Sequence, residues 1–258
     1  MRSLTNLLLL IVACCANAQK INPGDKESLR EAIRMSDSIL ANNPGAETYF
    51  MRGFYKTELS EFEGAIADFD AVLQLNPNHY DAYYSRGLTF QKIKRENSAI
   101  ADFSAAIALK PDVAKAYVGR AFSYLTKGNL KIALSDYDKA LSIDGNLTDA
   151  LLNRGKIYHE LGQTEKAIRD FDAAIAQNPK DAAAYANRGL SKASTGNKSA
   201  MLDFDKAIAL NPKDAASYFN RALFRLNHKM PGNHCADLRK ALELGMPEAK
   251  QIIVETCK

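Results

Sequence analysis

Hydrophobic residues recur along most of this chain at the spacing of amphipathic helices, and the whole pattern returns about every 34 residues. For example, Ile100, Phe103 and Ile107 follow the i, i+3, i+7 spacing that places side chains on one helical face. Most of the chain divides into six similar blocks: 46–79, 80–113, 114–147, 148–181, 182–214 and 215–248. The fifth block is one residue shorter than the others. The positions that the blocks share predict that each block is a helical hairpin.

Several kinds of residue hold fixed places in the blocks. An aromatic residue or leucine opens the first helix, an arginine follows three residues later, and a glycine or alanine comes next. The second helix carries an Ala-x-x-Asp sequence followed by an aromatic residue, and most blocks end on proline. The two charged columns are Arg52, Arg86, Arg120, Arg154, Arg188, Arg221 and Asp68, Asp102, Asp136, Asp170, Asp203, Asp237. Because a half-buried charge is costly without a partner, we expect the arginines to pair with the aspartates, within a block or between blocks.

Small residues and turn formers indicate how each hairpin closes. The glycine column of the first helix is expected to face the alanine column of the second, so leucine or valine at Gly87 should splay that hairpin. Proline lacks an N–H and restrains the residue before it, so it ends the second helix. Gly128 and Gly162 lie between the two helices, where the left-handed conformation ends a helix.

A fixed period near 34 with these small, aromatic and proline positions resembles the tetratricopeptide repeat. The resemblance extends over 46–248, although tyrosine stands where tryptophan is usual and arginine where leucine is usual before the glycine. It implies an all-α fold, a right-handed α-solenoid of about six helix-turn-helix units in which each repeat buries its face against its neighbours.

A capping helix is expected at each end of the repeats. Residues 19–45 have the apolar spacing of a lone second helix and would cover the open face of the first block. Residues 247–258 form a short final helix after a break at Gly245. Polar-faced terminal helices of this kind keep a solenoid soluble.

Residues 1–18 have the pattern of a secretory signal peptide. One basic residue, Arg2, precedes an apolar run over 7–13 and then small residues, and the run is too short to span a bilayer. We therefore expect the protein to be exported.

Two ways of processing this segment remain open. Ala16-Asn17-Ala18 is a cleavage site of the A-x-A kind and would give a soluble chain beginning at Gln19. The sequence before Cys14 also resembles a bacterial lipobox, which would place a lipid on Cys14. Cleavage after Ala18 leaves an even pair of cysteines, whereas lipidation leaves Cys15 as an odd thiol.

Cys235 lies early in the second helix of the sixth block, and Cys257 ends the final helix. If these helices are antiparallel, the start of one lies beside the end of the other, and a Cys235–Cys257 disulfide is geometrically natural. An exported compartment permits the bond, which would stabilise the fold by roughly 3 kcal/mol. The alternative is a buried free thiol at Cys235 and a frayed one at Cys257.

No residue pattern in the sequence indicates catalysis or a cofactor. Triplets such as Asp170-Phe171-Asp172 place two carboxylates on a helix where they point away from each other. His228 and His234 flank a Pro-Gly turn near Cys235, which is an ordinary turn rather than a metal-binding spacing. Phosphate loops and nucleophile elbows are absent from the sequence. We expect no enzyme, no cofactor, no metal and no small-molecule substrate.

The charge of the chain does not indicate a nucleic-acid or anionic-membrane partner. The formal net charge is +4, and the basic residues are spread rather than clustered.

By resemblance to the family, the first helices line a concave groove that receives extended peptides or partner helices. Two residues four apart on each first helix, with adjacent polar side chains, are implied to face it. The candidates are Phe50, Phe54, Tyr84, Leu88, Gln91, Val118, Phe122, Leu152, Lys156, His159, Leu190, Phe219 and Leu223. The alternative is that these residues only pack successive first helices together.

The groove composition favours an apolar partner. Asn153, Asn187 and Asn220 share a column compatible with the family's receptors for acidic chain ends, but the basic anchors of those receptors are missing. An apolar or amphipathic protein segment is the better candidate.

The sequence thus predicts a non-enzymatic protein–protein interaction scaffold exported to the bacterial cell envelope, periplasmic or secreted. Its partner would be another protein of the envelope, and it would meet the membrane only if lipidated. The alternative is a lipid-anchored outer-membrane assembly factor, similar to pilotin-like repeat lipoproteins.

Overall fold

The computed structural model describes residues 25–257, and this part of the chain consists of α-helices with no β-strand. The predictions for residues 1–18, including cleavage and the lipid on Cys14, lie outside the described residues. The chain divides into two compact units, the first ending at Asn129 and the second beginning at Leu130. The predicted all-α solenoid of consecutively packed helices is confirmed.

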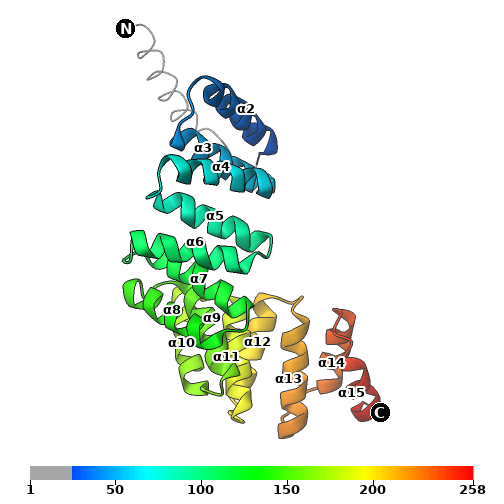
Figure 1. The fold of residues 1–258 in the computed structure, drawn as a ribbon. Coiled ribbons are helices and arrows are strands. Elements are labelled where there is room, and N and C mark those ends of the chain that lie inside the picture. Colours follow the sequence, from blue (N-terminus) through cyan, green and yellow to red (C-terminus); the bar gives the residue numbers. More distant parts are fainter. Residues whose placement is uncertain (1–24, 258) are drawn as a thin grey trace. The chain divides into compact units, whose positions relative to one another are not determined.

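In the first unit each helix packs against the next one along the chain (Figure 1). We call the first helix of each predicted block its A-helix and the second its B-helix. The helices of this unit are α2 (Lys26–Asn42), α3 (Ala46–Glu58), α4 (Phe62–Leu75), α5 (Tyr80–Lys92), α6 (Glu96–Leu109) and α7 (Ala114–Thr126). Successive A-helices also contact each other, α3 with α5 and α5 with α7.

The second unit continues the same alternation of A- and B-helices. Its helices are α8 (Leu130–Ile143), α9 (Thr148–Glu160), α10 (Thr164–Gln177), α11 (Ala182–Ser194), α12 (Ala200–Leu210), α13 (Ala215–His228), α14 (His234–Glu243) and α15 (Ala249–Thr256). The unit boundary therefore falls inside the third predicted block, between its A-helix α7 and its B-helix α8.

The hairpins turn through one residue in the left-handed conformation. The predicted glycines Gly128 and Gly162 have φ of +77° and +70°, which confirms their role. The equivalent positions in the first two blocks are Ser60 and Lys94, whose φ values are +64° and +58°. A side chain at such φ values is strained, so these two turns are less favourable than the glycine turns.

The glycine column faces the aromatic ring of the B-helix, and the prediction that it faces the alanine column was wrong. A Cβ atom at Gly87 would lie 2.9 Å from Cε1 of Phe103, and one at Gly155 would lie 2.7 Å from Cε1 of Phe171. The rings are fully buried, and the glycines leave them room to pack between the helices. The third block has Ala121 at this position, and its Tyr137 ring is fully buried as well. The last block has Ala222 there and the smaller Leu238 in place of the ring, and these two residues pack in one cluster.

Arginines of the predicted column pair with aspartates on two other helices, as Arg154 illustrates. Its Nε and Nη2 donate to the two carboxylate oxygens of Asp170 on its own B-helix at 2.8 and 2.7 Å. Its Nη1 donates to Asp138 on the preceding B-helix at 2.8 Å. The hydrogen bonds to Asp170 raise the pKa of Arg154 above its usual range, so the guanidinium stays charged.

This pattern, which we call the Arg–Asp ladder, recurs in both units and confirms the predicted pairing. The ladder contains both kinds of pair, one inside the block and one to the preceding helix. The further members are Arg52 with Asp68 and Asp37, Arg86 with Asp102 and Asp70, Arg188 with Asp203 and Asp172, and Arg221 with Asp237 and Asp205. In the third block Ser104 takes the place of the outer aspartate and accepts a hydrogen bond from Arg120 at 3.0 Å.

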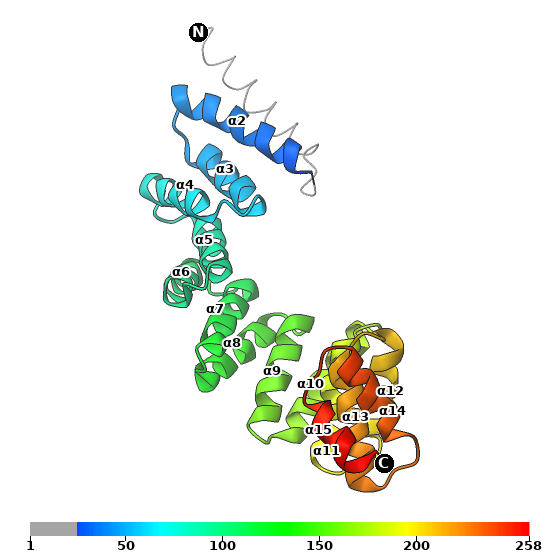
Figure 2. The ribbon, with the colours of Figure 1, turned by 90° about the vertical axis from the view of Figure 1, so that its right-hand side faces the viewer.

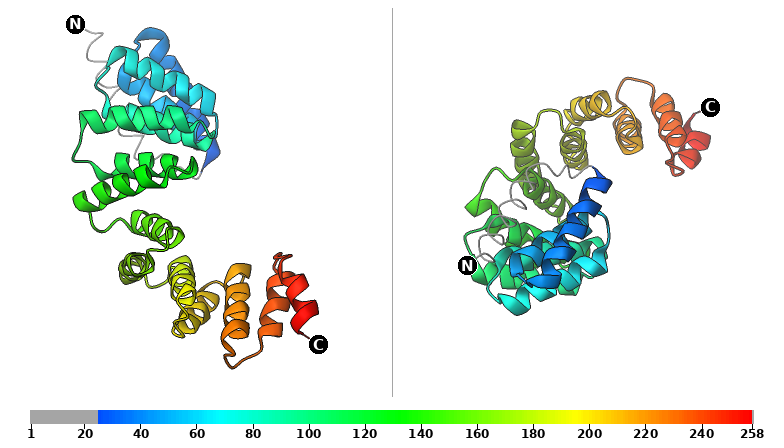
Figure 3. Two further views of the ribbon diagram at one scale, coloured as in Figure 1. Left: turned by 60° about the horizontal axis from the view of Figure 1, so that its bottom comes forward. Right: turned by 90° about the horizontal axis from the view of Figure 1, so that it is seen from above.

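A helix packs at each end of the described chain, against the first A-helix and against the last B-helix. Helix α2 lies alongside α3 (Figure 2), where Leu29 and Ala32 pack against Tyr55. Its Asp37 accepts from Arg52 at 2.6 Å, which is the role of a preceding B-helix in the ladder. At the other end, α15 packs on α14 (the red and orange helices of Figure 3) with Ala249 fully buried.

Candidate functional site

The A-helices carry all the candidate groove residues, and some of these residues hold successive A-helices together. Gln91 on α5 donates from Nε2 to the carbonyl of Gly119 and the hydroxyl of Ser123 on α7, both at 2.8 Å. His159 on α9 lies 3.1 Å from the hydroxyl of Ser191 on α11, measured from Nδ1. These two polar candidates therefore contribute to packing, which favours the alternative left open by the sequence.

The first column of apolar candidates points toward the B-helices. The ring of Phe50 contacts that of Phe69 on α4 at 5.9 Å, and Tyr84 contacts Phe103 on α6 at 5.8 Å between ring centroids. The other members of this column are Val118, which is half-buried, and Leu152 and Phe219, which pack against buried clusters of the second unit. This column serves mainly to build the hairpins.

The second column remains at the surface. The rings of Phe54 and Phe122 are 40% and 45% exposed, and Leu88 between them in the series is half-buried. We call these three residues, on the contacting helices α3, α5 and α7, the apolar stripe. In the second unit the same column holds Lys156, which is exposed, and Leu190 and Leu223, which are half-buried.

Two asparagines lie beside the candidate columns in the second unit. Asn187 on α11 and Asn220 on α13 are half-buried, and they occupy equivalent positions in their blocks. Within residues 25–257 their side-chain amides are not engaged in any hydrogen bond or ion pair. An amide that is half-buried and unpaired keeps a donor and an acceptor available for a ligand.

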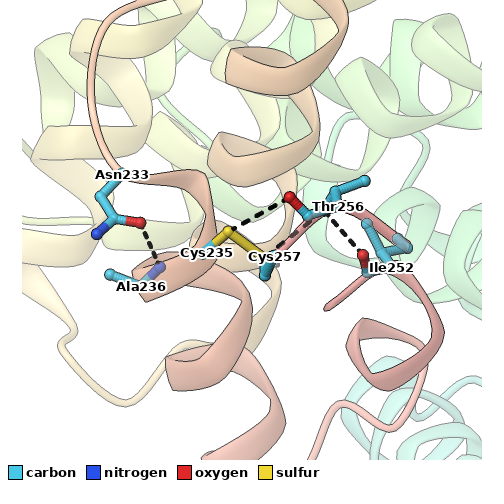
Figure 4. The surroundings of a disulfide bond; sticks show 6 residues. All are labelled: Asn233, Cys235, Ala236, Ile252, Thr256 and Cys257. Atoms are coloured by element: carbon cyan, nitrogen blue, oxygen red, sulfur yellow. Dashed lines mark hydrogen bonds between the residues drawn. A yellow bond between two sulfur atoms is a disulfide. The ribbon is translucent and has the colours of Figure 1, made fainter. Parts of the chain in front are cut away.

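Cys235 at the start of α14 and Cys257 after α15 are joined by a disulfide (Figure 4), with Cα atoms 5.6 Å apart. The two cysteines are 22 positions apart in the sequence. The backbone carbonyl of Thr256 lies 3.9 Å from Sγ of Cys235 (Figure 4). The bond ties the final capping helix to the last B-helix.

The described hollows do not coincide with the apolar stripe. One, of about 350 Å³, lies at the turns of the first unit beside Lys94, Arg95 and Lys127. Another, of about 400 Å³, lies against α15 beside Lys250 and Val254. None of the helices between residues 25 and 257 is both long and apolar enough to cross a membrane.

The period of the repeat and its alternating packed helices agree with the sequence-family comparison. Models of the tetratricopeptide repeat match residues 46–79, 80–113 and 114–147, and a second model of the repeat matches 136–169 and 204–245. A further TPR repeat model matches 155–196. These matches together cover more than half of the chain, and the protein belongs to the tetratricopeptide repeat family. No curated protein matches the chain significantly.

Solved structures share this fold. A tetratricopeptide repeat protein from Parabacteroides merdae ATCC 43184 has a TM-score of 0.66 at 18% identity, over 96% of this chain and 98% of its own. MamA has a TM-score of 0.60 at 26% identity, over 66% of this chain and 93% of its own. YrrB, described as a TPR protein with an unusual peptide-binding site, has a TM-score of 0.61 at 24% identity, over 70% of this chain and 94% of its own.

Proposed function

We propose that this protein is a non-enzymatic scaffold of the bacterial cell envelope that binds a peptide or helical segment of another protein along its A-helices. Membership of the tetratricopeptide repeat family and the likeness to solved TPR proteins support a role in protein interaction. The signal-peptide pattern of residues 1–18 is the basis for export.

The exposed rings of Phe54 and Phe122 carry the proposal. A phenylalanine offers about 200 Å² of side-chain area, so rings exposed by 40% and 45% present roughly 80–90 Å² each. At about 25 cal/mol per Å², covering both rings would contribute about 4 kcal/mol to binding, before the entropy of association is subtracted. The packing of α3, α5 and α7 leaves these rings uncovered. Leu88, at the equivalent position of α5, is the third residue of the apolar stripe.

The amides of Asn187 and Asn220 support an extended ligand in the second unit. Neighbouring helices lie about 10 Å apart, and an extended peptide advances about 3.3 Å per residue. One asparagine per A-helix would therefore meet the peptide backbone about every third residue. Such contacts hold a main chain without selecting its side chains, whereas the apolar stripe would select hydrophobic side chains.

The test is quantitative co-purification from the envelope with a stripe variant in which Phe54, Leu88 and Phe122 are changed to serine. We expect one envelope protein to be enriched with the natural chain and lost with the variant. Far-UV circular dichroism must first establish that the two proteins are equally helical, because Leu88 is half-buried.

A matched control removes apolar side chains of the B-helices instead. Leu75, Ile132 and Leu202 are 55%, 45% and 71% exposed, and all three are changed to serine. This control should retain the partner. Loss of the partner from the control alone, or its retention by a folded stripe variant, would assign binding to another surface.

The second candidate is a lipid-anchored assembly factor of the outer membrane, because the sequence before Cys14 resembles a lipobox. The intact mass of the exported protein separates the two forms, since cleavage after Ala18 gives an unmodified chain and lipidation gives an acylated Cys14. The same spectrum, recorded before and after reduction and alkylation, tests whether Cys235 and Cys257 are oxidised in the cell.

A further inference from the structure

Three side chains that commonly bind metals meet where the start of α14 lies beside the end of α15. His234 and Cys235 open α14, and Cys257 directly follows α15. One ring nitrogen of His234 and the two sulfur atoms all lie within 4.8 Å of one another, and the three residues are half-buried. The two sulfurs are joined in the disulfide, so the oxidised protein lacks thiolate ligands at this place.

The imidazole of His234 is not explained by the fold. Its Nε2 atom is shielded from water and lacks a hydrogen-bond partner within residues 25–257. The side chain is not needed to cap α14, because Asn233 accepts from the backbone N–H of Ala236 at 2.9 Å. A buried ring nitrogen without a partner is unfavourable, and it leaves the imidazole available as a ligand beside the two sulfur atoms.

We propose that the dithiol form of this protein binds one zinc-class divalent cation through Sγ of Cys235, Sγ of Cys257 and a ring nitrogen of His234. A tetrahedral zinc ion with Zn–S bonds of about 2.3 Å and a Zn–N bond of about 2.0 Å places its sulfurs about 3.8 Å apart, and nitrogen about 3.6 Å from each sulfur. The three ligand atoms already lie within 4.8 Å of one another. Once the S–S bond is broken, small side-chain movements are therefore enough to bring them to the distances that zinc requires. A water molecule would complete the fourth position.

Reduction and binding balance as two steps. The disulfide accepts two electrons and two protons from an external dithiol, which leaves as a disulfide, and Cys235 and Cys257 become thiols. The cation then binds the two thiolates and the neutral imidazole, and the two thiol protons are released to solvent. The site therefore exists only in the reduced protein.

Such a site would keep the final helix in place after reduction. Helix α15 has 8 residues, too few to be helical alone, and it is held by Ala249 and Ile252 against the cluster that contains Leu238. A cation that bridges Cys235 on α14 and Cys257 after α15 would replace the covalent link by a coordinate one. The unfolding temperature of the reduced protein should therefore rise when the cation is added.

The test uses the full chain without a histidine tag, reduced with a phosphine, and zinc as the probe. Zinc per chain is measured by elemental analysis after gel filtration, and affinity by competition with a chromophoric chelator. Cobalt serves as a spectroscopic substitute because thiolate coordination gives it a sulfur-to-metal charge-transfer band. We expect one zinc per reduced chain, none per oxidised chain, and none for the double variant Cys235→Ser/Cys257→Ser.

Histidine variants decide whether the third ligand takes part. His234→Ala should weaken zinc binding by about tenfold or more. His228→Ala is the matched control, because His228 is exposed and lies beside the same turn. This variant should bind zinc as tightly as the natural chain. If His234→Ala is not folded by circular dichroism, His234→Gln takes its place. Equal zinc content in the reduced chain and the double cysteine variant would overturn the site, and unchanged affinity in the folded His234 variant would overturn the role of the imidazole.

Discussion

The contact between the glycine column and the aromatic rings allows a sharp test at Gly87. Glycine in a helix interior is normally less stable than alanine by about 1 kcal/mol, so Gly87→Ala would be stabilising if space were available. Here the new Cβ would lie 2.9 Å from Cε1 of Phe103 and 3.1 Å from its Cδ1 and Cζ atoms. The ring of Phe103 has little room to move away from Gly87, because its other side lies against Gly119 on the next A-helix. A Cβ atom added at Gly119 would lie only 2.7 Å from Cε1 and Cζ of the same ring.

Overpacking of this kind costs about 1–3 kcal/mol, which outweighs the gain in helix propensity. We expect Gly87→Ala to lower the free energy of unfolding by about 1–2 kcal/mol. Gly64 on α4 provides the matched control, because a Cβ there would meet only the flexible Lys56 side chain, nearest at 3.3 Å. Gly64→Ala should raise the free energy of unfolding by up to about 1 kcal/mol.

A second substitution tests the stated cause. The last block combines Ala222 with Leu238, so the pair Gly87→Ala and Phe103→Leu reproduces an arrangement already present in the chain. We expect the double variant to be more stable than the sum of the single changes by about 1 kcal/mol. Urea unfolding followed by circular dichroism gives the four free energies, with the slopes compared because repeat arrays can depart from two-state unfolding. If Gly87→Ala is as stable as the natural chain, or if Phe103→Leu does not improve it, the steric argument is wrong.

Three further substitutions test the ladder, a turn and a helix cap. Asp170→Asn should lower the free energy of unfolding by about 3 kcal/mol, because Arg154 loses its bidentate partner. Asp172→Asn should lower it by less than about 1 kcal/mol, because the Asp172 carboxylate is 51% exposed. Equal losses in urea unfolding would contradict the difference between inner and outer aspartates. Lys94→Gly should stabilise by about 0.5–1 kcal/mol because φ at this residue is +58°, and a melting temperature that does not rise would argue against strain in the turn. Asp181→Ala should destabilise by about 1 kcal/mol because its side chain caps two N–H groups of α11, and unaltered amide exchange in the first turn of α11 would speak against that cap.

The sequence predicted the repeat, the helix positions and the partners of the charged columns, because these follow from local periodicity. Apolar spacing marks the buried face of each helix, and a residue type that returns once per block marks a position with the same surroundings each time. The arginine and aspartate columns could be matched in this way without coordinates, although the sequence left open whether a pair such as Arg154 and Asp170 lies within one block or between blocks. The αL glycines Gly128 and Gly162 were equally visible, because glycine adopts the left-handed conformation that ends a helix without steric cost.

The tertiary structure decided which side chains meet across helices. Gly87 faces the ring of Phe103 rather than an alanine, and Arg154 joins aspartates of two different helices. Gln91 is engaged between A-helices, whereas Phe54 remains exposed, although both were candidates for one groove. Periodicity along one helix gives the direction of a side chain but not the rotation and axial offset of the neighbouring helix. Those two quantities determine whether a candidate residue is buried in packing or left available to a partner.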